Sequence, residues 1–335
     1  MWNIFGGKET TESKKEKKPD LDILNGNCYE CDFCSAIHSL LEAPPLSIAK
    51  CEECGASNFV PYLIKHYWLY KPLGGGGMGS VYKAIHDENQ DWEFAIKVLP
   101  RNKKDDPRLI DSLMKEAAVG KTFGQHPHIV GIADYGKYND EYFAALYFCE
   151  GMRLDQVIEL PEPINPKYVL LWALQILSAE QHIYDCGYLY RDLKPQNIII
   201  DPAKNAKLFD FGLCMTVTEA RNQTSDTIDG SPLYMPPERI VGMPEDMSSE
   251  IYSLGMVMFH ALSRKTYYTS SGAFELARKH VTSLRTSSVA SKLPAFVDQR
   301  ISKVLDKMVA RSPSQRFRTY KEAAMAIKEV YKHLK

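Results

Sequence analysis

The apolar positions of this chain predict strands first and helices afterwards. Residues 94–98 and 142–148 are short runs rich in aliphatic and aromatic side chains, which is typical of strands. Residues 108–122 place apolar side chains three and four positions apart, as one face of a helix does. Helical spacing dominates the later part of the chain, most clearly over residues 168–184 and 248–263.

The beginning of the chain lacks this patterning. Residues 8–18 contain no apolar side chain, and their mixture of lysine and glutamate predicts a solvated segment. We therefore expect a flexible polar tail over residues 1–25, a separate cysteine-containing module over residues 26–62, and a larger unit from residue 66 onward. No internal repeat is apparent.

Composition is that of an ordinary globular protein and argues against several functions. Apolar residues make up 44% of the chain and charged residues 25%. The net charge of −1 gives no reason to expect nucleic acid or a membrane surface as a partner. The apolar run over residues 169–177 is much shorter than the ~18 residues of a membrane span, and no signal peptide is apparent. We expect a cytoplasmic protein.

The cysteines are concentrated near the N-terminus. Five of the eight lie between Cys28 and Cys54 and form Cys-x-x-Cys pairs. A secreted disulfide scaffold would spread its cysteines over the whole fold, whereas paired cysteines in a cytosolic chain indicate a metal.

Two of these pairs can supply four thiolates at tetrahedral corners for a structural Zn²⁺ ion. The expected ligands are Cys31, Cys34, Cys51 and Cys54. The segment resembles a zinc ribbon, and Gly55 suits the tight turn after the second pair. Cys28-x-x-Cys31 is also a possible pair. The alternatives are an iron site with the same ligands, or buried cysteines without a metal. The second is disfavoured, because so small a segment needs a cross-link such as a bound metal to be stable.

A second group of motifs points to phosphate chemistry. The glycine-rich stretch from Gly74 to Val81 fits G-x-G-x-x-G-x-V, and Lys97 follows within the apolar strand-like run. A dinucleotide-binding turn would continue as a helix, but strand-like residues follow here. Lys97 needs an anionic partner in such surroundings, and Glu116 on the predicted helix is the candidate.

Two motifs that contain an aspartate follow in the second half of the chain. Asp192 lies in the motif Tyr-Arg-Asp-Leu-Lys-Pro-Gln-Asn, and Asp210 is the first residue of the motif Asp-Phe-Gly. One carboxylate can receive the proton of a hydroxyl group. The other, with Asn197, can hold magnesium on a nucleotide.

Together these motifs resemble those of a bacterial-type serine/threonine protein kinase over residues 67–335. The resemblance implies an α+β, two-lobed protein kinase fold preceded by the small zinc ribbon. A β-rich small lobe would cover residues 66–146, a hinge residues 147–149, and a helical large lobe residues 150–335. ATP and Mg²⁺ would bind between the lobes, and the partners would be protein substrates.

The resemblance also implies roles for individual residues. Asp192 would accept or orient the hydroxyl proton, Lys194 would steady the γ-phosphate as in kinases specific for serine and threonine, and the Lys97–Glu116 pair would complete the catalytic set. Asn197 and Asp210 would hold Mg²⁺. The residues expected to contact ATP are Gly74, Gly76, Gly79, Val81, Lys97, Leu146, Phe148, Asn197 and Asp210.

The same resemblance implies a regulatory segment after Asp210. Arg191 would bind a phosphate there, and the candidate autophosphorylation sites are Thr224, Ser225 and Thr227. Glu238 would form a buried ion pair with Arg316.

The chain departs from the family pattern at a few positions. Tyr190 replaces the usual histidine, Glu250 replaces an aspartate, and Gly120 replaces a bulky residue, which predicts a loosely held small-lobe helix. None of these positions is among the main catalytic residues, so an active kinase is the principal interpretation. The alternatives are a pseudokinase scaffold that binds nucleotide, and a protein whose zinc ribbon recruits partners.

Overall fold

The computed structural model describes residues 17–76, 79–222, 230–270, 272–282 and 288–334, which form two compact units. The first unit contains the described residues up to Lys121 together with Gly131–Phe148, and the second contains Thr122–Val130 and the residues from Cys149 onward. None of the helices in the described ranges combines the length and the hydropathy that a membrane span requires.

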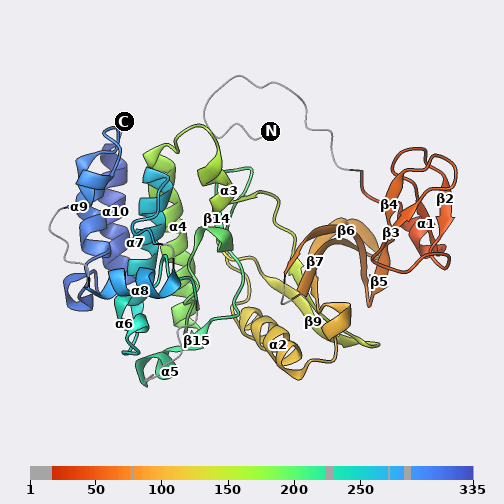
Figure 1. Cartoon of the computed structure of the whole chain (residues 1–335), viewed down its shortest axis with the longest axis horizontal. Coiled ribbons are helices and arrows are strands. Elements are labelled where there is room, and N and C mark those ends of the chain that lie inside the picture. The colour runs from red at the N-terminus through yellow and green to blue at the C-terminus, as the bar shows by residue number, and fades with distance from the viewer. Residues whose placement is uncertain (1–16, 77–78, 223–229, 271, 283–287, 335) are drawn as a thin grey trace. The chain divides into compact units, whose positions relative to one another are not determined.

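The first unit is a β-rich body with one long helix, coloured red to yellow in Figure 1. Its strands are β1 Cys28–Glu30, β2 Ile37–Ser39, β3 Ile48–Lys50, β4 Ser57–Phe59, β5 Tyr62–Ile64, β6 Tyr67–Gly76, β7 Gly79–His86, β8 Asn89–Val98, β9 Ile132–Tyr138 and β10 Glu141–Tyr147. Its helices are α1 Leu21–Asn25, η1 Arg101–Lys103 and α2 Pro107–Thr122.

Six strands form an antiparallel sheet in the order β5-β6-β7-β8-β10-β9. Side chains along β10 point alternately to the two faces of the sheet, so neighbouring residues pack in different clusters. Phe143 and Ala145 join the buried cluster of β6, β7 and β8, whereas Ala144 packs against α2 with Leu99. The strands and the helix expected in this region are therefore confirmed.

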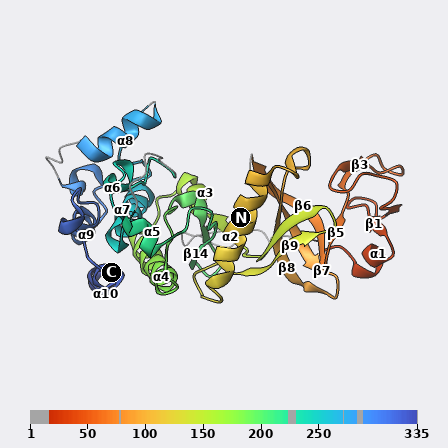
Figure 2. The ribbon, with the colours of Figure 1, turned by 90° about the horizontal axis from the view of Figure 1, so that it is seen from below.

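The cysteine module is continuous with this sheet. Its hairpins β1–β2 and β3–β4 lie beside β5, which pairs with β6 (Figures 1 and 2). Leu24 and Val60 of the module form a buried cluster with Trp68 and Ile85 of the sheet. The indole Nε1 of Trp68 also donates to Asn25 Oδ1 at 3.1 Å. These contacts make the module part of the first unit.

The structure places residues 21–25, which were expected in the polar tail, in a helix. Residues Leu21–Asn25 form α1, because the Asp20 side chain caps the helix and Leu24 is completely buried. The module boundary expected at residue 62 also falls within β5, at the start of the shared sheet.

The second unit is mainly helical. Its helices are α3 Leu154–Glu159, α4 Pro166–Asp185, η2 Pro195–Asn197, α5 Val217–Asn222, α6 Pro237–Ile240, α7 Met247–Ser263, α8 Ala273–Thr282, η3 Val289–Lys292, α9 Gln299–Met308, η4 Pro313–Gln315 and α10 Tyr320–His333. Its strands are β11 Met152–Arg153, β12 Tyr188–Leu189, β13 Ile198–Ile200, β14 Ala206–Leu208 and β15 Met215–Thr216. The helices α4, α7, α9 and α10 pack together, which confirms the helical interpretation of this region.

Candidate active site and metal centre

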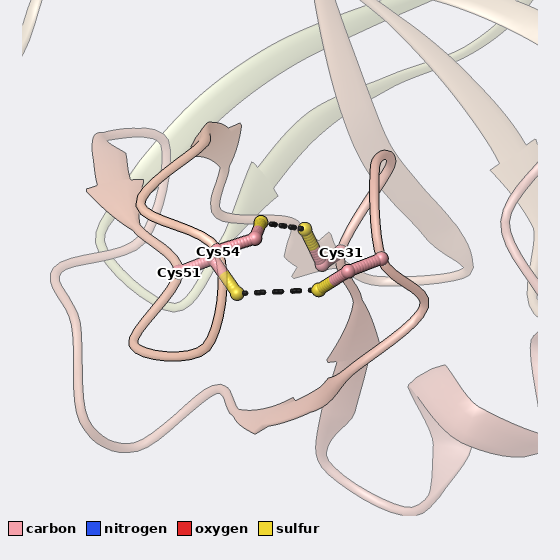
Figure 3. Close-up of side chains that lie close together, drawn as sticks. Cys31, Cys51 and Cys54 are labelled. Carbon is pink, nitrogen blue, oxygen red and sulfur yellow. Dashed lines mark hydrogen bonds between the residues drawn. The ribbon is translucent and has the colours of Figure 1, made fainter.

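The four expected thiols of the N-terminal module meet in one place. Cys31 Sγ lies 3.7 Å from Cys54 Sγ, and Cys34 Sγ lies 3.6 Å from Cys51 Sγ. Figure 3 shows the sulfur atoms of Cys31, Cys51 and Cys54 directed toward a common space. Four thiolates bound to one Zn²⁺ ion at 2.3 Å would be about 3.8 Å apart, so this set fits a tetrahedral zinc site. Cys28 is not part of the cluster.

The module is built from two copies of one turn, a repeat that the sequence analysis missed. The backbone N–H of Cys31 donates to Ala36 O, and that of Cys51 donates to Ala56 O, at 2.8 Å in both cases. The turn takes a positive φ at Ser35 and at Gly55. Only the second turn uses glycine for this conformation, which concealed the correspondence.

A polar side chain follows each pair by four residues and contacts the other pair. His38 Nε2 lies 3.2 Å from Cys51 Sγ, and Asn58 Nδ2 donates to Cys31 Sγ at 3.4 Å. Partners of this kind orient metal ligands and stabilise thiolate charge. The equal spacing from Cys34 to His38 and from Cys54 to Asn58 was the signal available in the sequence.

The glycine-rich stretch forms the end of β6 and the start of β7. Gly76 and Gly79 face each other across the hairpin, and the two residues between them lie outside the described residues. Gly79 has a φ of +151°, and a Cβ atom there would lie 2.6 Å from the carbonyl oxygen of Val98. Glycine is therefore required at this position. Gly74 has open space where a Cβ would be.

Lys97 and Glu116 form an ion pair within the first unit. Lys97 lies in β8 between Val81 of β7 and Ala144 of β10. Since Ala144 packs against α2, Lys97 faces the helix that carries Glu116. The Lys97 Nζ to Glu116 Oε2 distance is 2.6 Å, and both side chains are mostly buried. The lysine ammonium is thus fixed at the surface of the sheet.

Leu146 and Phe148 lie where the first unit ends. Leu146 packs against the cluster between β10 and α2. The N–H of Phe148 donates to Glu93 O at 3.0 Å, and Lys83 Nζ lies 4.3 Å from the centre of the Phe148 ring. The amide and the ring of Phe148 are therefore already engaged in the first unit. The unit boundary between Phe148 and Cys149 falls within the expected hinge.

Asp192 is the centre of the polar cluster in the second unit. Its Oδ2 accepts from Lys194 Nζ at 2.7 Å and from Asn197 Nδ2 at 2.8 Å. Burial raises the pKa of the Asp192 carboxyl despite Lys194, and the charge of Asp210 adds to this effect. A raised pKa makes the carboxylate a better proton acceptor, as a general base requires.

Asn197 and Asp210 offer oxygen atoms suited to Mg²⁺, which prefers hard oxygen ligands. The amide nitrogen of Asn197 is used by the backbone oxygen and the carboxylate of Asp192, so its amide oxygen is directed elsewhere. Asp210 follows β14 and has a φ of +67°, a sparsely populated conformation that is common at functional sites. This donor set fits a magnesium ion held on phosphate oxygens.

Contacts of aromatic side chains compensate for two departures from the family pattern, Tyr190 and Gly120. The hydroxyl of Tyr190 donates to Phe209 O at 2.6 Å, which supplies the partner that a buried tyrosine needs. Phe211 contacts Tyr190 on one side, and the ring of Phe123 packs edge-on against it with centroids 5.2 Å apart. Phe123 thus supplies the bulky side chain that Gly120 lacks.

The loose attachment of α2 expected from Gly120 is not seen in the structure. Leu113 and Ala117 of α2 are buried against Leu99 and Ala144 of the sheet. The helix is therefore anchored by its apolar face.

Two further expectations concern charged residues in the second unit. Arg316 Nη1 and Nη2 lie 2.7 and 2.9 Å from the two carboxylate oxygens of Glu238, so the expected ion pair is present. Arg191, expected to bind an activation-segment phosphate, instead forms an ion pair with Glu245 at 2.8 Å. The candidate phosphorylation sites Thr224, Ser225 and Thr227 lie outside the described residues.

Residues 67–333 match the family described as protein kinase domain. The chain is 32% identical over 265 residues to serine/threonine-protein kinase PrkC of Bacillus subtilis (strain 168), covering 79% of this chain and 40% of that protein. It is 31% identical over 277 residues to serine/threonine-protein kinase PknH of Mycobacterium tuberculosis (strain ATCC 25618 / H37Rv), covering 82% of this chain and 42% of that protein. The chain thus spans about two fifths of the length of these curated relatives.

Solved structures agree on the fold. The crystal structure of the PknI kinase domain of Mycobacterium tuberculosis matches with a TM-score of 0.59 and 23% identity, covering 80% of this chain and 97% of that one. At this identity the match concerns the fold alone. The cysteine module lies before the residues that match the protein kinase domain.

Proposed function

The chain belongs to the protein kinase family and is of the bacterial serine/threonine type, with an added four-cysteine module, and on that premise we propose that it is an active enzyme. The proposed reaction transfers the γ-phosphoryl group of ATP to serine and threonine hydroxyls of protein substrates. The observation that carries this proposal is the buried carboxylate of Asp192, held by Lys194 and Asn197 with a raised pKa.

Each side chain has a role in the proposed reaction. Asp192 receives the proton of the substrate hydroxyl as that oxygen attacks the γ-phosphorus. Lys194, which donates to Asp192, is placed to stabilise the negative charge that develops on the transferred group. The bond to the β-phosphate oxygen breaks, and ADP leaves. Because little covalent chemistry is required of the protein, positioning and charge account for most of the catalysis.

The nucleotide would be held by charged side chains and by backbone amides. We propose that Lys97, fixed by Glu116, binds the α- and β-phosphates, while backbone amides of the Gly74–Val81 stretch surround the phosphate chain. Asp210 and the amide oxygen of Asn197 would hold Mg²⁺, which neutralises phosphate charge when bound. Autophosphorylation is part of the same proposal.

The four-cysteine module is proposed to bind a structural Zn²⁺ ion. Four thiolates leave no open coordination position, so a catalytic role for the ion is not expected. Thiols persist in reducing compartments, which favours a cytoplasmic location for this part of the chain. The shared core of Leu24, Val60, Trp68 and Ile85 argues that the ion stabilises the first unit as a whole.

A pseudokinase scaffold is the alternative, and one assay separates the two functions. The full chain is incubated with γ-labelled ATP, Mg²⁺ and a peptide library containing serine, threonine or tyrosine acceptors. We expect label on serine and threonine, and a loss of about 100- to 10,000-fold in kcat for Asp192→Asn, which removes the general base. Equal, background-level transfer by both proteins, with nucleotide still bound, would establish the scaffold.

A further inference from the structure

Four ionisable side chains are buried together beside Asp192. Arg191 precedes the catalytic aspartate, Arg239 lies in α6, Glu245 lies in the loop between α6 and α7, and Glu250 lies in α7. All four are buried, and Glu245 is only 1% exposed. Charges buried to this degree are stable only when they are paired, so the pairing determines the conformation of the loop.

Glu245 joins the two arginines. Its Oε1 accepts from Arg191 Nε at 3.1 Å and from Arg191 Nη2 at 2.8 Å. Its Oε2 accepts from Arg239 Nε at 2.7 Å. Two N–H groups of Arg191 therefore converge on one carboxylate oxygen, and hydrogen bonds between charged groups are stronger than those between neutral groups.

The backbone of Arg191 is fixed as well. Its N–H donates to both carboxylate oxygens of Glu250, at 3.2 and 3.1 Å, and its carbonyl oxygen accepts from Arg239 Nη1. Arg191 has a φ of +67°, which such contacts must maintain. Side chain, amide and carbonyl of the residue before Asp192 are therefore all engaged within the second unit.

The charge state of Glu245 agrees with this geometry. Burial acts to raise the pKa of its carboxyl, but the positive charges of Arg239 and Arg191 outweigh burial and lower it. Glu245 is therefore an anion at neutral pH. Its backbone N–H donates to Ala220 O at 3.0 Å, which connects it to α5, the last described helix before the candidate phosphorylation sites.

We propose that Glu245 is a positioning residue whose carboxylate occupies the place of an activation-segment phosphate on Arg191. Phosphoryl transfer, the proposed function on which this inference rests, then proceeds without prior phosphorylation of that segment. Glu245 acts through Arg191 on the position of Asp192 and contacts no substrate.

The first part of the test removes phosphate from the full chain. Wild type is treated with a protein phosphatase and its unphosphorylated mass is verified, and a variant combines Thr224→Ala, Ser225→Ala and Thr227→Ala. Peptide phosphorylation is then measured with labelled ATP and Mg²⁺. We expect both proteins to retain the kcat of phosphorylated wild type. Activity that returns only after the segment is phosphorylated would overturn this inference while leaving the proposed function intact.

The second part changes Glu245 itself. Glu245→Gln keeps the shape but removes the charge, and we expect kcat to fall about 100-fold, the loss expected from a displacement of about 1 Å, while KM for ATP is unchanged. Glu245→Asp keeps the charge and should recover part of kcat, and it replaces Glu245→Gln as the test if that variant does not fold. The exposed Glu162→Gln variant should behave as wild type.

The outcomes are separable. An unchanged kcat in both Glu245 variants, or a change confined to KM for ATP, would overturn the positioning role. Transfer by neither phosphorylated nor unphosphorylated wild type would overturn the proposed function and, with it, this inference.

Discussion

At the scale of single residues, the chain contains an acid whose burial should affect stability. Glu180 of α4 is fully buried, and neither of its oxygens accepts or donates a hydrogen bond among the described residues. Burial and the charge of Glu250 raise its pKa well above the ordinary value. Burial also raises the pKa of Glu250, to about 7. Both carboxyls therefore retain protons in the native state that the unfolded chain releases.

The raised pKa values of Glu180 and Glu250 predict that the free energy of unfolding falls as pH rises. Above the ordinary pKa of 4.5 the unfolded state binds fewer protons than the native state, so the free energy of unfolding decreases up to about pH 7 or beyond. A shift of the size given for Glu250 corresponds to roughly 3 kcal/mol. In Glu180→Met the decrease between pH 5 and pH 8 should be smaller, as measured by denaturant unfolding. The exposed Glu159→Met variant should follow wild type, and a Glu180→Met profile parallel to wild type would refute the explanation.

At the scale of elements, the β6–β7 hairpin depends on one glycine. Gly79→Ala would place a Cβ atom against Val98 O at a φ that alanine rarely adopts. We expect a loss of about 1–3 kcal/mol in the free energy of unfolding of the full chain. Gly74→Ala is the matched control in the same hairpin, because a Cβ there meets no atom within 4 Å. Equal stability of the two variants would contradict this requirement.

A second prediction at this scale concerns the zinc content of the cysteine module. Cys51→Ser removes one corner of the tetrahedral set, and the metal content of the purified protein should fall from one zinc per chain to a small fraction. Cys28→Ser should keep its zinc, since Cys28 lies outside the cluster. Elemental analysis measures both. Zinc retained by Cys51→Ser and lost by Cys28→Ser would reverse the ligand assignment, and iron in wild type would change the identity of the metal.

At the scale of the whole molecule, the sequence predicted most of the fold but missed some contacts between distant segments. Strong periodicity identified the strands and helices around Lys97 and Glu116, because local propensity and burial favour the same conformation there. Leu24 was assigned to a polar tail because its burial depends on Trp68, a residue far along the chain. Glu245 was missed for the same reason: nothing near it in the sequence indicates Arg191 as its partner.

The proposed function requires that Lys97 and Asp210 both contribute to the binding of Mg·ATP, and calorimetric titration of Mg·ATP into the full chain measures this. We expect one site per chain and an affinity about tenfold or more weaker in both Lys97→Met and Asp210→Asn, because each variant loses a charged contact to the ligand. Lys115→Met, at an exposed position of α2, should bind as wild type. Wild-type affinity in both Lys97→Met and Asp210→Asn would show that these residues do not hold the nucleotide.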